Sequence, residues 1–176
     1  LIHLMPCGDA YHKGKVGSIS DRLAMLQLSV EGITNLALDS RETRRQGATY
    51  TVDTLTELRQ ELGEDAHICW VMGTDAAASV KSWRDWPRLF QLANVIVMAR
   101  AGEKPITLDW PAIFMDDVNE FKQQPSGCYT MCTLPQVLLS SSDIRQAVNQ
   151  QQPVVDHVPR AVNDYIKKHG LYRGNN

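Results

Sequence analysis

The sequence predicts an α/β fold in which a mostly parallel sheet is covered by helices on both faces. Short apolar runs alternate with helical patterns through most of the 176 residues. The most strand-like run, residues 67–72, is nearly all apolar, as expected for a central strand buried on both faces. With 43% hydrophobic and 22% charged residues, the chain is apolar enough for one domain with a sizeable core over residues 1–176.

Charge and cysteine content narrow the class of protein. The formal net charge of -2 argues against a nucleic-acid partner, because binding to many phosphates needs a clear basic excess. The four cysteines lack the paired spacing of metal ligands and are typical of a reducing cytosol. No apolar run is long enough to span a membrane. We therefore expect a cytoplasmic protein without a membrane partner or a protein-bound metal, and homo-oligomer formation stays open.

The first part of the chain is expected to form two strands and two helices. An apolar strand spans residues 1–5, and Ser20 can cap a helix that Gly32 ends. Alternating apolar residues predict a short strand at 36–38. Thr51 can cap the next helix, which ends before a glycine. Its expected buried stripe consists of Leu55, Leu58 and Leu62.

The middle of the chain follows the strand at residues 67–72. Pro87 is expected to start a helix, and residues 95–99 form another buried strand. Prolines interrupt residues 101–127, so we expect a surface excursion with at most one short helix near 110–121.

The last part begins with a strand at residues 128–134. A serine-rich turn follows it and opens a helix that runs to about Gln150. A final helix is expected from Pro159 to Gly170, because proline suits a first turn and glycine suits a helix end.

The serine-rich turn, residues 138–145, places three consecutive hydroxyls at the start of a helix. Serine and aspartate cap helices because their oxygens accept the unpaired N–H groups of the first turn. The surplus hydroxyls, the free N–H groups and the helix dipole would suit a phosphate, with Arg145 able to fork onto its oxygens. An ordinary cap with an arginine on a solvated face is the alternative, and these eight residues alone favour it.

Polar side chains also follow other predicted strands. His12 and Lys13 come after the first strand, and Asp75 comes after the third. Because ligands bind at the carboxyl ends of the strands in such folds, these groups and the serine-rich turn favour a nucleotide site at that edge. For Asp75, a turn-forming role is as good an interpretation as ligand binding. For His12 and Lys13, a position in a solvated loop is equally good.

The segment Leu139–Arg145, L-S-S-S-D-I-R, resembles the I-S-S-T-x-I-R signature of adenylyltransferases of the nucleotidyltransferase superfamily. Further segments, in order and spacing, resemble one family of that superfamily, bacterial nicotinate mononucleotide adenylyltransferase. These segments are Leu4-Met5-Pro6, Asp21–Met25, Leu38–Glu42, Thr49–Leu55, Gly73-Thr74-Asp75, and Tyr165-Ile166 with Gly170–Arg173. The resemblance covers nearly the whole chain. It implies a Rossmann-like nucleotidyltransferase fold and transfer of AMP from ATP to nicotinate mononucleotide, giving deamido-NAD and pyrophosphate in NAD biosynthesis.

The resemblance implies that Ser140, Ser142 and Arg145 hold the β- and γ-phosphates of ATP. The third hydroxyl belongs to a serine where the family usually has threonine, which keeps the donor. Mg²⁺ would enter with ATP as cofactor and bridge phosphate oxygens. His12 and Lys13 could reach a phosphate as well.

Five residues are implied to bind nicotinate mononucleotide. They are Asp75, Trp83, Thr49, Tyr50 and Thr51. Asp75 would accept hydrogen bonds from ribose hydroxyls, and Trp83 would stack on the pyridine ring. The three residues from 49 to 51 would meet the ring carboxylate through hydroxyl and backbone donors. An unpaired tryptophan is more often part of a core than a stacking platform. Only the spacing of Trp83 from Gly73-Thr74-Asp75 favours it over Trp86 as the stacking residue.

The sequence also departs from the family pattern. The family begins with a strand and the turn G-G-T-F-D-P-x-H-x-G-H, whose two histidines contact the ATP phosphates and support the transition state. No such segment occurs here, and His3 and His12 stand too far along to replace the pair, so we assign no catalytic residue. We expect the chain to lack about 35 residues, the length of one strand-turn-helix unit.

Two alternatives stay open. A relative without that part of the site could bind nucleotide as a sensor or partner subunit without chemistry. Within the enzyme class, the pantetheine-phosphate branch fits less well, because that enzyme is usually shorter and residues 49–55 do not suit it.

Overall fold

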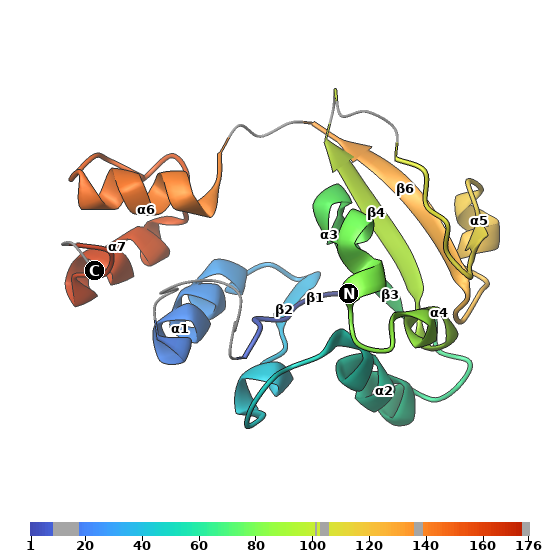
Figure 1. The fold of residues 1–176 in the computed structure, drawn as a ribbon. Coiled ribbons are helices and arrows are strands. Elements are labelled where there is room, and N and C mark those ends of the chain that lie inside the picture. The colour runs from blue at the N-terminus through green and yellow to red at the C-terminus, as the bar shows by residue number, and fades with distance from the viewer. Residues whose placement is uncertain (9–17, 101, 103–105, 136–138, 174–176) are drawn as a thin grey trace. The chain divides into compact units, whose positions relative to one another are not determined.

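The computed structural model describes residues 1–8, 18–100, 102, 106–135 and 139–173 (Figure 1). They form two compact units, one from Leu1–Thr49 with Leu138–Asn176 and one from Tyr50–Val137. We describe each unit by itself, and a single domain over residues 1–176 stays a prediction. His12 and Lys13 lie outside the described residues.

The first unit combines a two-stranded parallel sheet with three α-helices. Its elements are β1 (Ile2–Leu4), α1 (Ile19–Val30), β2 (Leu36–Leu38), the 3-10 helix η1 (Arg41–Arg44), α6 (Ser141–Asn149) and α7 (Arg160–His169). Both predicted strands are confirmed, and Ile2 lies opposite Leu36 in the ladder. The final helix also has its expected ends, because Pro159 occupies the N-cap and Gly170 the C-cap of α7.

Hydrogen bonds to one carboxylate join α1 to α7 within this unit. The α1 helix starts at Ser18, whose hydroxyl accepts from the Asp21 N–H at 3.0 Å, so the predicted cap at Ser20 is wrong. The Asp21 carboxylate accepts from the Ser18 hydroxyl at 2.6 Å and from the Tyr165 hydroxyl at 3.0 Å. These two hydrogen bonds lower the pKa of Asp21. Below them, Met25 and Leu28 of α1 pack against a buried cluster of valine and isoleucine side chains from the last two helices and their connection.

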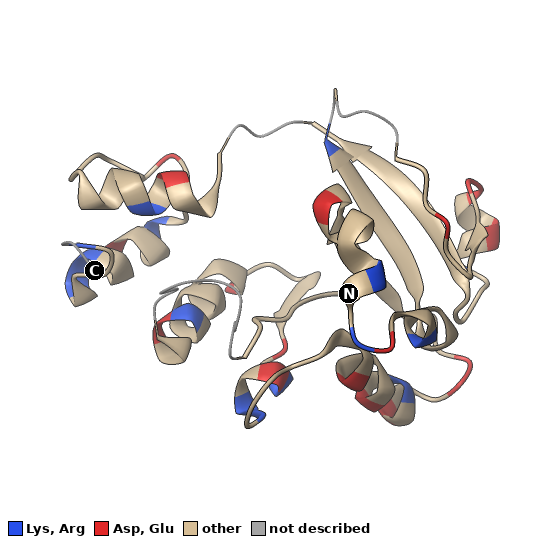
Figure 2. Ribbon diagram, viewed as in Figure 1, with Lys and Arg blue, Asp and Glu red and all other residues tan. Residues whose placement is uncertain are grey.

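The second unit is built on a four-stranded parallel sheet. Its elements are α2 (Thr51–Leu62), β3 (Cys69–Gly73), α3 (Thr74–Ser79), the 3-10 helices η2 (Val80–Ser82) and η3 (Trp86–Arg88), α4 (Leu89–Leu92), β4 (Asn94–Arg100), β5 (Ile113–Phe114), α5 (Val118–Phe121) and β6 (Cys128–Leu134). The strand order is β3-β4-β6-β5. Arg100, at the end of β4, is the one charged residue in these strands (Figure 2). Every recorded strand pair in both units is parallel, which confirms the predicted α/β fold.

Burial in this sheet corrects the predicted role of residues 67–72. In the part of the chain that the structure describes, β3 lies at the edge of the sheet, and its Val71 side chain is 47% exposed. The strand buried in the middle is β4, where Val95 and Val97 are almost completely covered. An apolar run alone therefore did not distinguish a central strand from an edge strand. The excursion at 101–127 contains the expected short helix, α5, and also the two-residue strand β5.

Two details of α2 differ from the prediction. Tyr50 occupies the N-cap without a side-chain hydrogen bond, so Thr51 is the first helical residue rather than the cap. Leu62 is 59% exposed, whereas Leu55 is fully buried. The helix instead turns Arg59 inward, and this side chain is 4% exposed.

The buried Arg59 guanidinium donates six hydrogen bonds, all to backbone carbonyls. The acceptors belong to Gly63, Glu64, Ala66, Leu92 and Pro125, at N···O distances from 2.6 to 3.1 Å. They lie in the connection from α2 to β3, at the end of α4 and in the loop before β6. Arginine offers five N–H donors in a fixed fork, so one side chain can satisfy carbonyls from three segments.

A second buried polar side chain aligns the starts of β4 and β6. The Asn94 amide donates to the Gln124 carbonyl at 2.7 Å and accepts from the Cys128 N–H at 2.9 Å. The His67 Nδ1 atom also bonds the Gln124 carbonyl, which leaves Nε2 to accept from the Cys69 thiol at 3.0 Å. Burial raises the pKa of Cys69 to about 11, in keeping with a protonated thiol that donates.

No helix among the described residues is long and apolar enough to cross a membrane, since the longest have 12 residues.

Replacing Arg59 by methionine should lower the free energy of unfolding of the second unit by about 3 kcal/mol or more, because buried carbonyls lose their donor. All four tryptophans lie in this unit, so tryptophan fluorescence during urea unfolding reports on it. Arg88→Met is the matched control, because Arg88 of η3 is exposed and lies in the same unit. Equal stability of the two variants would contradict the structural role of Arg59.

Candidate functional site

The N-terminus of α6 carries a complete capping box. The Ser140 hydroxyl accepts from the Asp143 N–H at 3.1 Å, and the Asp143 carboxylate accepts from the Ser140 N–H at 2.7 Å. These reciprocal bonds satisfy the first-turn groups that a helix leaves unpaired. Ser140 therefore acts as an ordinary cap, while the exposed Ser141 and Ser142 are the surplus hydroxyls of this turn.

Arg145 lies over the same turn. Its Nη2 atom donates to the Ser142 hydroxyl at 3.0 Å, and the residue is half-buried. The guanidinium has further donors beyond this bond, and the dipole of α6 places positive potential at the same end. A hydroxyl, a guanidinium and first-turn N–H groups at one helix end are the groups that bind phosphate oxygens.

Two hydrogen bonds act on the Asp143 carboxyl. Hydrogen bonds from the Ser140 hydroxyl and backbone N–H lower the pKa of this exposed carboxyl. The negative charge of Asp143 stabilises the N-terminus of α6, but it would also repel an anion bound there. The hydroxyls and N–H groups must therefore reach a phosphate on the side away from Asp143.

Asp75 lies in the second unit, in the first turn of α3 directly after β3. Its exposed carboxylate has no hydrogen-bond or ion-pair partner among the described residues. Asp75 does not form a separate turn, because β3 ends at Gly73 and α3 begins at Thr74. The carboxylate oxygens are therefore available to accept from hydroxyl groups of a ligand.

Trp83 and Trp86 have different surroundings. Trp83 ends η2, is half-buried and packs on one side against the core. Trp86 makes an edge contact with Phe90, with ring centroids 6.3 Å apart, and the Lys81 ammonium lies 5.8 Å from its ring. Trp86 is thus held by core and charge contacts, in line with its predicted structural role.

Tyr50 is joined to a residue that sequence reasoning missed. The Arg84 guanidinium lies 4.7 Å from the Tyr50 ring centroid, and its Nη1 atom is 3.8 Å from the Asp53 carboxylate. This cation–π contact fixes the ring at the start of α2, next to Thr51. Nothing in the sequence pattern linked positions 50 and 84, because the contact joins residues far apart in the chain.

Thr49 lies in the first unit, where its hydroxyl is 3.7 Å from the Cys7 thiol. Gly8 is packed beside it, since a Cβ there would lie 2.5 Å from the Glu42 carbonyl oxygen. Only glycine fits this approach of two backbone segments. Thr49 therefore packs against Cys7 and Gly8, which follow β1.

The predicted site residues divide between the two units, and the structure brings together those of one helix turn. Ser140, Ser142 and Arg145 share one helix turn in the first unit, which also holds Thr49. The second unit holds the others, namely Asp75, Trp83, Tyr50 and Thr51. No group of three potential metal ligands occurs among the described residues.

Comparison with known proteins identifies relatives of the whole chain. No family model matches the chain. Proteins named probable nicotinate-nucleotide adenylyltransferase are similar to it. One from Chromobacterium violaceum is 38% identical over 98% of this chain and 84% of the relative. Another from Hahella chejuensis is 38% identical over 97% of this chain and 81% of the relative.

A solved structure is similar in fold. Plasmodium falciparum nicotinic acid mononucleotide adenylyltransferase, complexed with NaAD, matches with a TM-score of 0.67 and 19% identity, covering 97% of this chain and 81% of that one. The fold is therefore the Rossmann-like fold of a nucleotidyltransferase. On the identity to its sequence relatives, the chain belongs to the nicotinate-nucleotide adenylyltransferase family.

Asp143→Asn should change the pH dependence of stability. The folded-state pKa of Asp143 is lowered, so the ionised carboxylate stabilises α6 above the unfolded value, about pH 4. This contribution is lost as the pH falls through the lower folded-state value. Melting curves by circular dichroism should therefore separate wild type from Asp143→Asn at pH 7 and converge toward pH 2.

Asp156→Asn is the control, because this exposed carboxylate in the same unit lies outside the capping box. An Asp143→Asn difference that stays constant over the whole pH range would contradict a charge-dependent cap.

Proposed function

We propose that this protein transfers AMP from ATP to nicotinate mononucleotide, giving deamido-NAD and pyrophosphate. The observation that carries the proposal is its membership of the nicotinate-nucleotide adenylyltransferase family at 38% identity over nearly the whole chain. The phosphate-suited turn at the start of α6 supports it independently of the comparisons.

In this reaction the 5′-phosphate of the mononucleotide attacks the α-phosphorus of ATP in line. The bond from that phosphorus to the bridging oxygen breaks, and pyrophosphate leaves. The protein forms no covalent bond, so its contribution is positioning and neutralisation of phosphate charge.

For ATP, the Ser142 hydroxyl and the Arg145 guanidinium would donate to oxygens of the β- and γ-phosphates. The capping box already uses the Ser140 hydroxyl as an acceptor for the Asp143 N–H. Ser140 therefore contributes by holding the turn and, through its remaining hydrogen, as a donor. The dipole of α6 adds to the attraction for the leaving group.

For nicotinate mononucleotide, the exposed Asp75 carboxylate would accept from ribose hydroxyls, and Trp83 would stack on the pyridine ring. Thr49, Tyr50 and Thr51 would donate to the ring carboxylate. Tyr50 has no side-chain hydrogen bond capping α2, which leaves first-turn N–H groups of that helix for the ligand. Arg84 would act by holding the Tyr50 ring in place.

Mg²⁺ fits this chain as part of the bound nucleotide. The described residues contain no cluster of three potential ligands, and Mg²⁺ with nucleotides is commonly held by phosphate oxygens and one or two carboxylates. When bound, it would neutralise phosphate charge. We place the reaction in the cytoplasm, supported by the free thiols of all four cysteines.

The direct test is pyrophosphate release by protein expressed from its complete reading frame. With ATP and Mg²⁺, release should depend on added nicotinate mononucleotide, and the dinucleotide should form in equal amount. The amide form of the mononucleotide, run alongside, ranks the two substrates. An absence of release with either mononucleotide would contradict the proposal.

Arg145→Ala should weaken use of ATP by roughly 10- to 100-fold, the effect of losing one charge-assisted contact. Arg145→Lys should fall between it and wild type, because lysine keeps the charge but not the fork. Arg160→Ala, at an exposed position on α7, is the control. A large fall in melting temperature with unchanged kinetics would return Arg145 to a structural role.

Trp83→Leu and Trp86→Leu should separate ligand stacking from core packing. Loss of a stacked ring costs about 1–3 kcal/mol, so Trp83→Leu should raise KM for nicotinate mononucleotide roughly 10-fold. Trp86→Leu should leave KM unchanged and lower the melting temperature, because its ring packs on Phe90. The reverse pattern would assign the stacking role to Trp86.

A further inference from the structure

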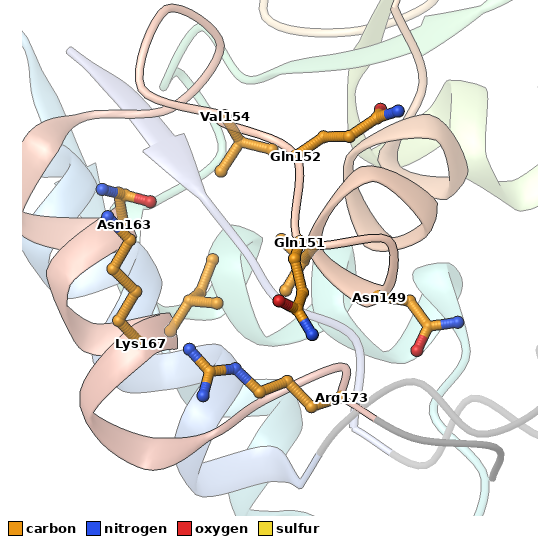
Figure 3. A pocket seen from close by; sticks show the side chains of 9 residues that line it. Asn149, Gln151, Gln152, Val154, Asn163, Lys167 and Arg173 are labelled. Atoms are coloured by element: carbon orange, nitrogen blue, oxygen red, sulfur yellow. The ribbon is translucent and has the colours of Figure 1, made fainter.

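A cavity of about 310 Å³ opens in the first unit between the end of α6 and α7 (Figure 3). Its lining includes Val148 at the end of α6, which is seven residues from Ser141 at the start. At 1.5 Å per residue, Val148 lies about 10 Å along the helix from Ser141 and about 4.5 Å from Arg145. None of the residues that line the cavity belongs to the serine-rich turn.

One wall of the cavity is a buried amide. Asn163 on α7 is 3% exposed, and its side chain has no hydrogen-bond partner among the described residues. Buried amides are nearly always hydrogen-bonded, because an unpaired one costs free energy. The Asn163 amide lines the cavity, so a ligand or water inside can supply its partner (Figure 3).

Two cations line the same space. Lys167 lies one turn after Asn163 on the same face of α7, and Arg173 follows the helix. Figure 3 shows the Lys167 ammonium beside the Asn163 amide and the Arg173 guanidinium turned toward the same side. No acidic side chain lines the cavity, and none among the described residues pairs with either cation. The last carbonyls of α7 are bonded by the N–H groups of Gly170 and Leu171, which reduces their repulsion of an anion.

Gln151 is placed over the cavity by an unusual backbone. Its φ of 57° is left-handed, a conformation that a side chain with a Cβ rarely adopts. The turn is fixed by bonds from the Gln151 N–H to Val148 and from the Gln152 N–H to Ala147. Figure 3 shows the Gln151 amide extending into the cavity toward Arg173. The bonds from the Gln151 and Gln152 N–H groups are those of a common helix ending, in which the residue after the C-cap is left-handed.

We propose that this cavity binds a small phosphate monoester. Two positive charges without an opposing acid match a dianion, which phosphate monoesters approach at neutral pH. Arg173 would fork onto two phosphate oxygens and Lys167 would bind a third, while the amides of Asn163 and Gln151 bond the ester oxygen or a neighbouring hydroxyl. The apolar side chains of Val154 and Ile166 would cover the carbon body of the ligand. This second anion site does not depend on the proposed reaction.

The test measures binding of glycerol 3-phosphate by calorimetry at constant ionic strength, with the full chain carrying Arg145→Ala. That substitution weakens the turn at the start of α6, so the remaining binding reports on the cavity. Adding Lys167→Ala or Arg173→Ala should raise the dissociation constant roughly 10- to 100-fold, the effect of one charge-assisted contact. Adding Lys168→Ala should leave it unchanged, because Lys168 neighbours Lys167 on α7 but does not line the cavity.

Gln151→Gly separates binding from folding. Glycine adopts a positive φ without strain, so the melting temperature should stay or rise while binding weakens. Absence of binding in the Arg145→Ala protein, or equal affinity in the Lys167 and Lys168 variants, would overturn the proposal. Tighter binding of succinate than of glycerol 3-phosphate would overturn the assignment to a phosphate.

Discussion

The geometry of the second unit depends on one buried cation. The Arg59 side chain extends from α2 into the protein and donates to carbonyl oxygens of three separate segments. These include the carbonyls of Gly63, Leu92 and Pro125. A helix end, a strand entry and a loop are thereby held at one point by hydrogen bonds that no apolar side chain could supply. Asn94 adds a second such point at the start of β4 and β6. The opposite ends of the parallel strands lead into exposed polar residues such as Asp75.

Helix N-termini present hydrogen-bonding groups in both units. At α6, the first turn is stabilised by its own capping box and still presents a hydroxyl, N–H groups and the Arg145 guanidinium. At α2, the N-cap residue Tyr50 offers no side-chain cap, and its ring is fixed by Arg84. The start of α6 is therefore capped by its own side chains, whereas the start of α2 has no side-chain cap.

The serine-rich turn shows that structural and functional interpretations of a residue can both hold. Ser140 caps α6, as expected for an ordinary helix cap, and its hydroxyl oxygen accepts from the Asp143 N–H. Ser142 and Arg145, which the cap does not use, pair with each other at 3.0 Å. The cap orders the turn and leaves the Ser142 and Arg145 side chains at the same helix end. The cavity beside Asn163 and Lys167 shows a different arrangement, in which side chains alone form the wall and no helix N-terminus takes part.

The sequence by itself determined the features that depend on neighbours in the chain. The parallel α/β class, the strand at Cys128–Leu134 and the helix between Pro159 and Gly170 follow from local periodicity, proline and glycine. The family could also be recognised from short segments kept in order. Only the tertiary structure decided that β3 lies at an edge, that Leu62 is exposed while Arg59 is buried, and that Arg84 stacks on Tyr50. Each of these depends on contacts between residues far apart in sequence, where the burial of one side chain is set by what packs against it rather than by its own polarity.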